Sequence, residues 1–103
     1  MDAPFSLLKR DEAGGILAAC RAQIDGPLVH LSDLWVAPEA RHRGEGRALV
    51  TQLLDEARTR GAERALATTA TPEAGSFVQA LGFERVLDVP PGAPERVIWS
   101  HRL

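Results

Sequence analysis

The chain has 103 residues, of which 45% are apolar and 25% are charged, and its formal net charge at pH 7 is −2. This length fits one domain with a modest core, so residues 1–103 are predicted to form a single domain. The near-balanced charge argues against general nucleic-acid or membrane binding and restricts any basic site to a local cluster. Because Cys20 is the only cysteine, neither an internal disulfide nor a cysteine-based zinc site is expected.

Neither the start of the chain nor any apolar run indicates export or membrane insertion. The first residues, MDAPFSLLKR, lack the basic region and long apolar segment of a signal peptide. No apolar run approaches the roughly 20 residues that span a bilayer. We therefore expect a cytoplasmic protein without a membrane partner.

The first third of the chain is predicted to form three strands. FSLLKRDEAGG indicates a strand followed by a glycine turn. The next segment alternates like a strand, although its alanines also fit a helix, and one face holds Ile16, Ala18, Cys20, Ala22 and Ile24. Asp25 and Gly26 form a hairpin signal that Pro27 closes. LVHLSDLWV then predicts a third strand that ends before Pro38.

A helix is predicted to begin near Gly44, because apolar and polar residues separate onto two sides. Its apolar side holds Leu49, Val50, Leu53, Leu54 and Ala57. Gly61 stands where a left-handed C-terminal cap is expected. RALATT predicts a short strand. A second helix, TPEAGSFVQALG, has Thr71 as N-cap, Pro72 in its first turn and Gly82 as its stop.

The end of the chain is predicted to add two strands, FERVLDV and RVIWSHRL, around the loop PPGAP. The order is therefore three strands, a helix, a strand, a helix and two strands. The middle of this order should be a right-handed crossover between parallel strands. We expect an α/β (α+β) fold with a mixed, mostly antiparallel twisted sheet, a central parallel pair and two main helices.

The segment RHRGEGRALV places three arginines, a histidine and two glycines just before the apolar part of the first helix. The first turn of a helix leaves N–H groups unpaired, and the helix dipole makes that end positive. Glycine lets another group approach the backbone closely. With Arg41, Arg43 and Arg47, this pattern favours a phosphate site over a basic loop whose glycines only shape the turn. Nucleotide P-loop and dinucleotide fingerprints both fit it poorly.

The longer segment LWVAPEARHRGEGRALV resembles the acetyl-CoA signature of the GNAT superfamily of N-acetyltransferases. In that pattern a valine ends a strand, a proline often follows two residues later, and Arg or Gln-x-x-Gly-x-Gly or Ala comes next. The matching residues here are Val36, Pro38, Arg41, Gly44 and Gly46. TPEAGSFVQALGFERV resembles the family's later helix and strand, which end in Leu-Gly-Phe. Both motifs stand in the family's order and spacing.

The resemblance implies that the strand ending at Val36 and the strand near Leu66 splay apart to admit acetyl-CoA. The pantetheine arm would hydrogen-bond to backbone around Leu34 and Val36, and the pyrophosphate would lie on N–H groups of the loop. The residues expected to bind this co-substrate are Leu34, Trp35, Val36, Arg41, His42, Arg43, Gly44, Glu45, Gly46, Arg47, Thr71 and Phe77.

The general acid of the family has no counterpart in this sequence. Many members carry a tyrosine just after the aromatic residue or leucine of the second helix, where it protonates the leaving thiolate. Phe77 holds the first of these positions, Val78 stands at the second, and the chain contains no tyrosine. Thr71 replaces an asparagine that often begins this helix. The thiolate proton would then come from water or from Ser76, which otherwise is a helix surface residue.

The general base has two candidates. An amine acceptor must lose a proton near pH 7, and histidine titrates in that range. His30 lies six residues before Val36, where some family members have an acidic base; the alternative is a partly buried sheet residue without a catalytic role. Asp33 competes for this role, but strict alternation places it on the opposite face from His30 unless a bulge intervenes. Trp35 and Trp99 are expected to pack within the sheet.

The sequence thus predicts an acetyl-CoA-dependent N-acetyltransferase that acts on a primary amine of a small molecule, peptide or protein, without a metal. One alternative is a non-catalytic acyl-CoA-binding sensor or subunit. A nucleic-acid-binding domain is the third reading, and the acidic net charge disfavours it.

A homodimer is also expected. Family members usually have a first strand and two helices that form one wall of the acceptor site, and the sequence matches the family only after them. Without them an apolar strip of the sheet should be exposed, and such strips usually mark interfaces. A twofold dimer would cover it and rebuild the wall. The last two strands are the expected contact, since Val97 and Trp99 alternate with Ile98 and Ser100.

Overall fold

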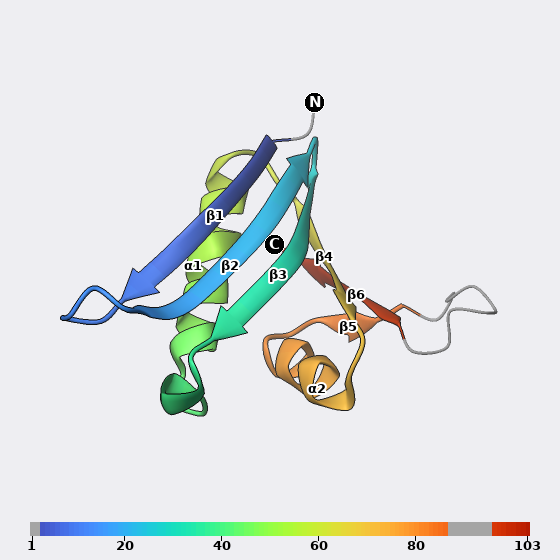
Figure 1. Cartoon of the computed structure of the whole chain (residues 1–103). Coiled ribbons are helices and arrows are strands. Elements are labelled where there is room, and N and C mark those ends of the chain that lie inside the picture. The colour runs from blue at the N-terminus through green and yellow to red at the C-terminus, as the bar shows by residue number, and fades with distance from the viewer. Residues whose placement is uncertain (1–2, 87–95) are drawn as a thin grey trace.

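The computed structural model describes residues 3–86 and 96–103. Its helices and strands follow the predicted order (Figure 1). The elements are β1 (Ala3–Arg10), β2 (Ile16–Asp25), β3 (Leu28–Val36), η1 (Pro38–Ala40), α1 (Glu45–Thr59), β4 (Arg64–Thr69), α2 (Pro72–Ala80), β5 (Glu84–Arg85) and β6 (Val97–Arg102). No helix in these two ranges is long and apolar enough to span a membrane.

The strands form one six-stranded sheet in the order β1-β2-β3-β4-β6-β5. Within the described residues β3 and β4 are parallel, and the other neighbouring pairs are antiparallel. This confirms the predicted mixed sheet with a central parallel pair. The alanine-containing segment that could also have been a helix forms the strand β2. The strand predicted from FERVLDV is shorter, since β5 covers Glu84–Arg85 and residues 87–89 lie outside the described ranges.

Both helices cover the same face of the sheet. The chain passes from β3 through α1 to β4, and from β4 through α2 to β5, and both connections move toward the β5 edge of the sheet. Right-handed crossovers that move in the same direction place their helices on the same side of the sheet. One buried cluster joins the two helices to the strands, with Leu49, Val50 and Leu53 from α1 and Val78 from α2 among its members. Figure 1 shows α1 behind β1, β2 and β3, whose opposite face is turned toward the viewer without a covering helix. We call this opposite face the outer face.

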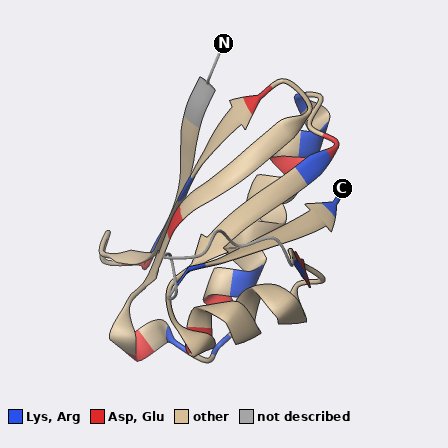
Figure 2. Ribbon diagram, turned by 90° about the vertical axis from the view of Figure 1, so that its right-hand side faces the viewer, with Lys and Arg blue, Asp and Glu red and all other residues tan. Residues whose placement is uncertain are grey.

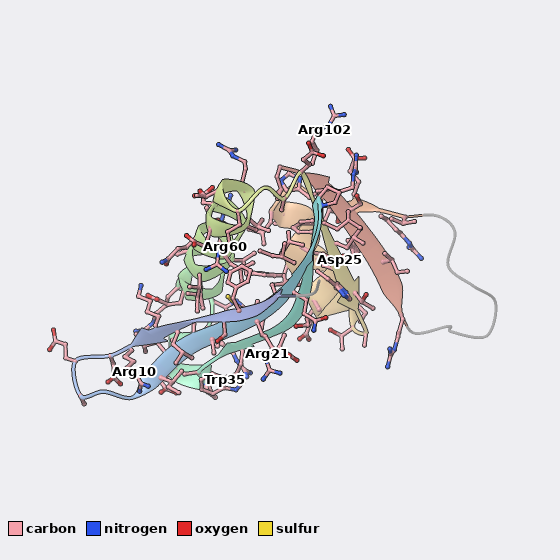
Figure 3. All side chains as sticks on the ribbon, turned by 90° about the horizontal axis from the view of Figure 1, so that it is seen from above. Arg10, Arg21, Asp25, Trp35, Arg60 and Arg102 are labelled. Carbon is pink, nitrogen blue, oxygen red and sulfur yellow. The ribbon has the colours of Figure 1, made fainter. Side chains whose placement is uncertain are left out.

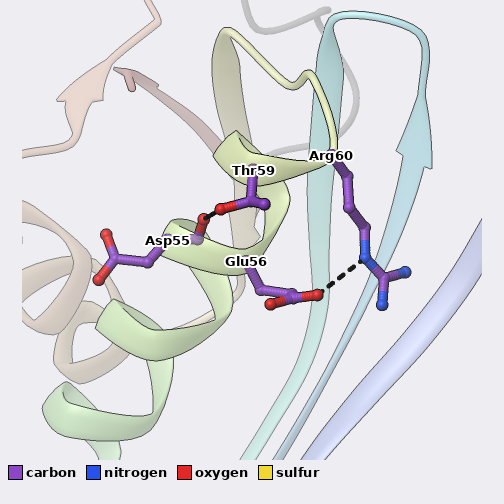
Figure 4. A network of polar contacts seen from close by, with 4 residues as sticks. All are labelled: Asp55, Glu56, Thr59 and Arg60. Carbon is purple, nitrogen blue, oxygen red and sulfur yellow. Dashed lines mark hydrogen bonds and ion pairs between the residues drawn. The ribbon is translucent and has the colours of Figure 1, made fainter.

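The C-terminal end of α1 is tied by local polar contacts. Arg60 Nε donates to Glu56 Oε1 at 3.1 Å, and Thr59 Oγ1 donates to the carbonyl of Asp55 at 3.0 Å (Figure 4). An exposed pair at this spacing contributes about 0.2–0.5 kcal/mol to a helix. Gly61 follows with φ 102°, the left-handed conformation predicted for the residue after the helix.

A bulge in β3 changes which side chains share a face. Arg21 of β2 pairs with Asp33, and the next residue, Ala22, pairs with Leu31. Ser32 is therefore an extra residue in β3 without a paired residue in β2. Leu31 is buried, whereas His30 and Asp33 are both exposed on the outer face. The bulge is the exception that the sequence analysis named, and it overturns the strict alternation that would have separated these two side chains.

Candidate active site

The pairing between β3 and β4 stops partway along both strands. Leu31 and Ala67 are the last paired residues, whereas β3 continues to Val36 and β4 continues to Thr69. A cleft of about 1000 Å³ lies between these unpaired strand ends, the start of α1 and one side of α2. The parallel strands therefore splay apart, as the family resemblance implies.

The unpaired end of β3 turns backbone groups toward the cleft. The N–H of Ala37 donates to the carbonyl of Leu17 at 2.8 Å, which makes these two residues a hydrogen-bonded pair across β2 and β3. Antiparallel ladders alternate, so the N–H and carbonyl groups of Val36 and Leu34 point away from β2. Nε of Arg41 donates to the carbonyl of Val36 at 3.0 Å. The N–H groups of Leu34 and Val36 and the carbonyl of Leu34 are left facing the cleft.

The start of α1 has the backbone geometry of an anion site. Gly44 is the N-cap in the left-handed region with φ 81°, and it makes no side-chain capping bond. The N–H of Ala48 donates to the carbonyl of Gly44 at 3.0 Å, so the N–H groups of residues 45–47 precede the first intrahelical bond. These groups and the helix dipole favour an anion at this end of the cleft.

Basic side chains from the same segment line this end of the cleft. Arg41, His42 and Arg47 are among the lining residues, whereas Arg43 is not. His42 has φ 64°, a left-handed conformation that is uncommon for residues other than glycine. Elsewhere, acidic and basic residues are interspersed along the elements (Figure 2). The cationic groups of the segment thus reach the cleft from a loop in an unusual backbone conformation.

The two glycines of the segment have different roles. A Cβ atom at Gly46 would lie 3.0 Å from Val36 Cγ2 and 3.6 Å from Phe77 Cζ, so this glycine lets α1 approach β3 and α2. A Cβ atom at Gly44 would meet nothing within 4 Å, and glycine is favoured there by the positive φ. Both glycines were predicted to admit a phosphate, and at Gly46 the structure adds a second reason, because a side chain there would meet Val36 and Phe77.

Glu45 adds a carboxylate to the otherwise positive start of α1. Its Oε2 atom lies 2.7 Å from Nζ of Lys9 in β1. The same oxygen is shielded from solvent and receives no directional hydrogen bond, so the ammonium group of Lys9 is the counter-ion that offsets its charge. Lys9 was not predictable as a partner of Glu45, because nothing in the sequence pairs residues so far apart.

The wall formed by α2 contributes Thr71 and Phe77 to the cleft. Thr71 Oγ1 accepts a hydrogen bond from the N–H of Ala74 at 3.1 Å, which confirms its predicted role as N-cap. Val78, at the position of the family's tyrosine, is buried. Ser76 is exposed and does not line the cleft. Neither residue therefore offers a proton donor inside the cleft.

The two predicted base candidates lie on the outer face, and one of them reaches the cleft. Asp33 lines it and lies 3.8 Å from Arg21, measured between Oδ2 and Nε. His30 does not line it, but its Nε2 atom lies 3.5 Å from Oγ1 of Thr68, which does. Thr68 was not among the predicted site residues, although ligand sites tend to form at the C-terminal ends of parallel strands. The described residues contain no group of three or more metal-ligating side chains.

The two tryptophans differ in environment. Trp99 is buried, and its Nε1 donates to Thr69 Oγ1 at 2.8 Å, so its predicted place in the packing of the sheet is confirmed. The same expectation is wrong for Trp35, which is 48% exposed and lines the cleft. Figure 3 shows Trp35 and Arg21 on the side of the sheet away from α1. The outer face thus presents an indole close to the mouth of the cleft.

Comparisons with known proteins agree with this architecture. A crystal structure of an acetyltransferase from Bacillus cereus ATCC 14579 is 25% identical, has a TM-score of 0.85, and matches 99% of this chain and 74% of its own. Nourseothricin acetyltransferase is 22% identical with a TM-score of 0.82, over 96% of this chain and 65% of its own. PaiA N-acetyltransferase from Thermoplasma acidophilum, solved in complex with coenzyme A, is 16% identical with a TM-score of 0.85, over 97% and 61%.

The last two likenesses show the fold alone, and this chain spans less than two thirds of both proteins. No curated protein gives a significant match. A family model described as acetyltransferase (GNAT) family matches residues 2–83. Since that match spans most of the chain and the sheet splays where the family's does, this chain belongs to the GNAT family of acetyltransferases.

Proposed function

We propose that this chain binds acetyl-CoA in the cleft between β3 and β4 and transfers the acetyl group to a primary amine. Family membership supports acyl-CoA-dependent acetyl transfer in general. The observation that carries the proposal for this chain is the interrupted pairing after Leu31 and Ala67, which opens a cleft leading to the start of α1. A cleft of about 1000 Å³ has room for an extended pantetheine arm.

The cleft-lining groups suit the pantetheine arm and the pyrophosphate of acetyl-CoA. Free backbone groups of Leu34 and Val36 suit the amides of the pantetheine arm, because both partners are hydrogen-bonding amide groups. The N–H groups at the start of α1, with Arg41 and Arg47, suit the pyrophosphate. Phe77 offers an apolar wall. We assign the other predicted binding residues that line the cleft, Trp35, His42, Gly44, Glu45, Gly46 and Thr71, to this site as well, whereas the assignment of Arg43 loses support because it lies outside the lining.

Transfer requires a neutral amine beside the thioester carbonyl. Holding the two reactants together provides much of the rate enhancement in such reactions, and no metal is needed for it. His30 and Asp33 are the proposed bases, since both lie on the outer face beside the splayed strands. The acceptor would approach from that face. Its amine belongs to a small molecule, a peptide or a protein.

A second candidate function is non-catalytic binding of an acyl-CoA, as a sensor or subunit. The observation that favours it is the lack of any tyrosine, with buried Val78 at the family's position for the general acid. Acetyl-CoA would still bind under this reading. Release of free CoA in the presence of amines separates the two functions.

We also propose that the chain forms a homodimer in the cytoplasm. The contact expected from β6 loses support, because Trp99 is buried and both edges of β6 pair with other strands. The outer face fits a second copy better. Leu8 and Trp35 are exposed there, and Arg21 and Asp33 provide charges of opposite sign that a twofold axis would match. Light scattering at micromolar concentration tests this assembly, and a stable monomer contradicts it.

The test of function has two measurements on one preparation. Thermal unfolding with and without acetyl-CoA reports binding, because a ligand of the folded state raises Tm. Thiol release with an amine panel (polyamines, aminoglycosides, amino acids and lysine peptides) reports transfer. Both signals are expected. A rise in Tm without thiol release favours the sensor, and no rise in Tm rejects both readings. Strongly salt-dependent DNA binding would instead indicate a nucleic-acid-binding domain.

A further inference from the structure

We propose that the hydroxyl group of Thr68 relays protons between His30 and the cleft, so that one histidine serves both as base for the amine and as acid for the thiolate. This inference rests on the acetyl transfer proposed above. It addresses two features of the chain together: a histidine beside the cleft but outside it, and the lack of tyrosine.

Thr68 occupies the point at which the two parallel strands separate. It follows Ala67, the last residue of β4 that pairs with β3. Its exposed side chain lines the cleft, and its Oγ1 atom lies 3.5 Å from Nε2 of His30. His30 stands opposite Leu66 in the parallel register, one residue before the end of pairing. The hydroxyl group of Thr68 is therefore the contact between the imidazole and the cleft.

The other hydroxyl groups that line the cleft already have partners. Ser32 donates to a backbone carbonyl of β2 at 3.1 Å. Thr69 accepts from the indole N–H of β6 at 2.8 Å and is buried. Thr71 accepts from a backbone N–H of α2 at 3.1 Å. Among the cleft-lining hydroxyls of the described residues, Thr68 is the one whose contact is a titratable side chain.

The contact between Thr68 and His30 is longer than a well-formed hydrogen bond between a hydroxyl group and a ring nitrogen. Hydroxyl donors usually lie about 2.5–3.0 Å from their acceptors. Hydrogen bonds used in catalysis are often long in the free enzyme and shorten when substrate binds. Both residues are exposed, so their side chains can adjust by rotating within open space. The separation of 3.5 Å is short enough to close without moving either strand.

The proposed proton transfers balance over one turnover. The amine nitrogen attacks the thioester carbonyl carbon and forms the C–N bond. A proton of that nitrogen passes to Oγ1 of Thr68, while the hydroxyl proton of Thr68 passes to Nε2 of His30. The C–S bond then breaks, and the proton returns by the same route to the thiolate. The products are the amide and the thiol of CoA, and both residues return to their starting states.

The relay needs His30 in its neutral form with the proton on Nδ1, because Nε2 must accept. Charged side chains also lie along β3 and the two strands that pair with it. Asp33 in β3 is paired with Arg21 in β2. Asp25 lies further along β2, and Arg64 lies along β4.

The kinetic test compares Thr68→Val with Thr68→Ser. Thr68→Val keeps the shape and removes the hydroxyl, so kcat should fall about 100-fold, in the range for loss of general acid–base catalysis, with little change in KM for acetyl-CoA. Thr68→Ser should keep kcat within about threefold of the parent. His30→Ala should cost as much as Thr68→Val, and the double variant no more than either. Both variants should lose the same limb of the pH–rate profile. An unchanged kcat in Thr68→Val, or losses that multiply, overturns the relay.

An independent measurement does not need turnover. Nitrogen NMR of labelled imidazole reports which ring nitrogen of His30 carries the proton. Parent protein should hold the Nδ1–H tautomer in larger proportion than Thr68→Val does, because the threonine hydroxyl donates to Nε2. Equal tautomer proportions in both proteins overturn the contact. If acetyl-CoA binds but no amine releases thiol, the proposed transfer fails, and this spectrum still decides whether Thr68 and His30 are linked.

Discussion

Lys9 sets how much negative charge is present at the start of α1. Its ammonium group lies 2.7 Å from the shielded carboxylate oxygen of Glu45, beside the proposed pyrophosphate site. Lys9→Met should leave that carboxylate without its counter-ion and weaken acetyl-CoA binding about tenfold, equivalent to about 1.4 kcal/mol. Glu45→Gln should not weaken binding, and the double variant should behave like Glu45→Gln. Calorimetric titration measures all four affinities. Parent-like binding by Lys9→Met would show that the pair does not influence the site.

Gly46 lies where α1 packs against β3, so a side chain at this position should lower the stability of the fold. Gly46→Ala should lower the free energy of unfolding by about 1–3 kcal/mol, because its Cβ atom would lie 3.0 Å from Val36 Cγ2. Adding Val36→Ala should recover part of the loss that Gly46→Ala causes in the parent background. Gly44→Ala is the matched control. It should cost about 1–2 kcal/mol through its positive φ, and Val36→Ala should not rescue it. Urea denaturation of the variants checks this, and equal rescue at both glycines contradicts it.

At the scale of elements, a buried side-chain hydrogen bond links β4 to β6 in addition to their backbone ladder. Thr69 Oγ1 accepts from Trp99 Nε1 at 2.8 Å. Thr69→Val should cost about 1–3 kcal/mol of unfolding free energy, because it preserves the shape but leaves the buried indole N–H unpaired. Thr69→Ser keeps the acceptor and should lose only about 0.8 kcal/mol for its missing methyl group. If denaturation curves give the reverse order, packing rather than hydrogen bonding determines this contact.

The order and type of the elements were predictable because each depends on local pattern. A short stretch of sequence is enough to predict the alternation of β2, the amphipathic pattern of α1 and the N-cap at Thr71. Features that depend on distant partners were not predictable. The bulge at Ser32, the pair of Lys9 with Glu45 and the contact of Thr68 with His30 each require knowledge of register or packing.

The same limit explains the mixed outcome for the site residues. Most of the residues that the sequence pattern grouped together line the same cleft. The pattern could not tell that a side chain at Gly46 would meet Val36 and Phe77 or that Trp35 faces outward, because the face that a residue takes depends on the bulge and on the approach of α1. Whether these residues bind acetyl-CoA stays a prediction.

The whole molecule is a sheet covered on one face, and the cleft runs between strands rather than over a face. Both helices pack against the inner side, where the buried cluster lies. This arrangement places the proposed acyl donor site toward the helices and the proposed bases on the outer face. The gap after Leu31 and Ala67 is therefore where donor and acceptor would meet, and the stability of the surrounding core determines how well that gap is held.

Cys20 makes that core sensitive to alkaline pH. Burial raises the pKa of its thiol, and a backbone hydrogen bond with Leu7 offsets part of the effect. A pKa raised by folding means that the folded protein holds the thiol proton more tightly than the unfolded chain. The resulting stability is complete below the usual thiol pKa of about 8.5 and is lost as the pH rises through the folded value.

The free energy of unfolding should therefore fall above about pH 8.5, by up to about 1.4 kcal/mol per pH unit for one proton. Few other groups can contribute, because the chain has no tyrosine and a single lysine, and arginine stays charged. Urea denaturation between pH 7 and 10 measures the slope. Cys20→Ala should flatten it while lowering stability at neutral pH, whereas Lys9→Met should leave it in place. A slope that persists in Cys20→Ala would assign the alkaline loss to the lysine or the amino terminus instead.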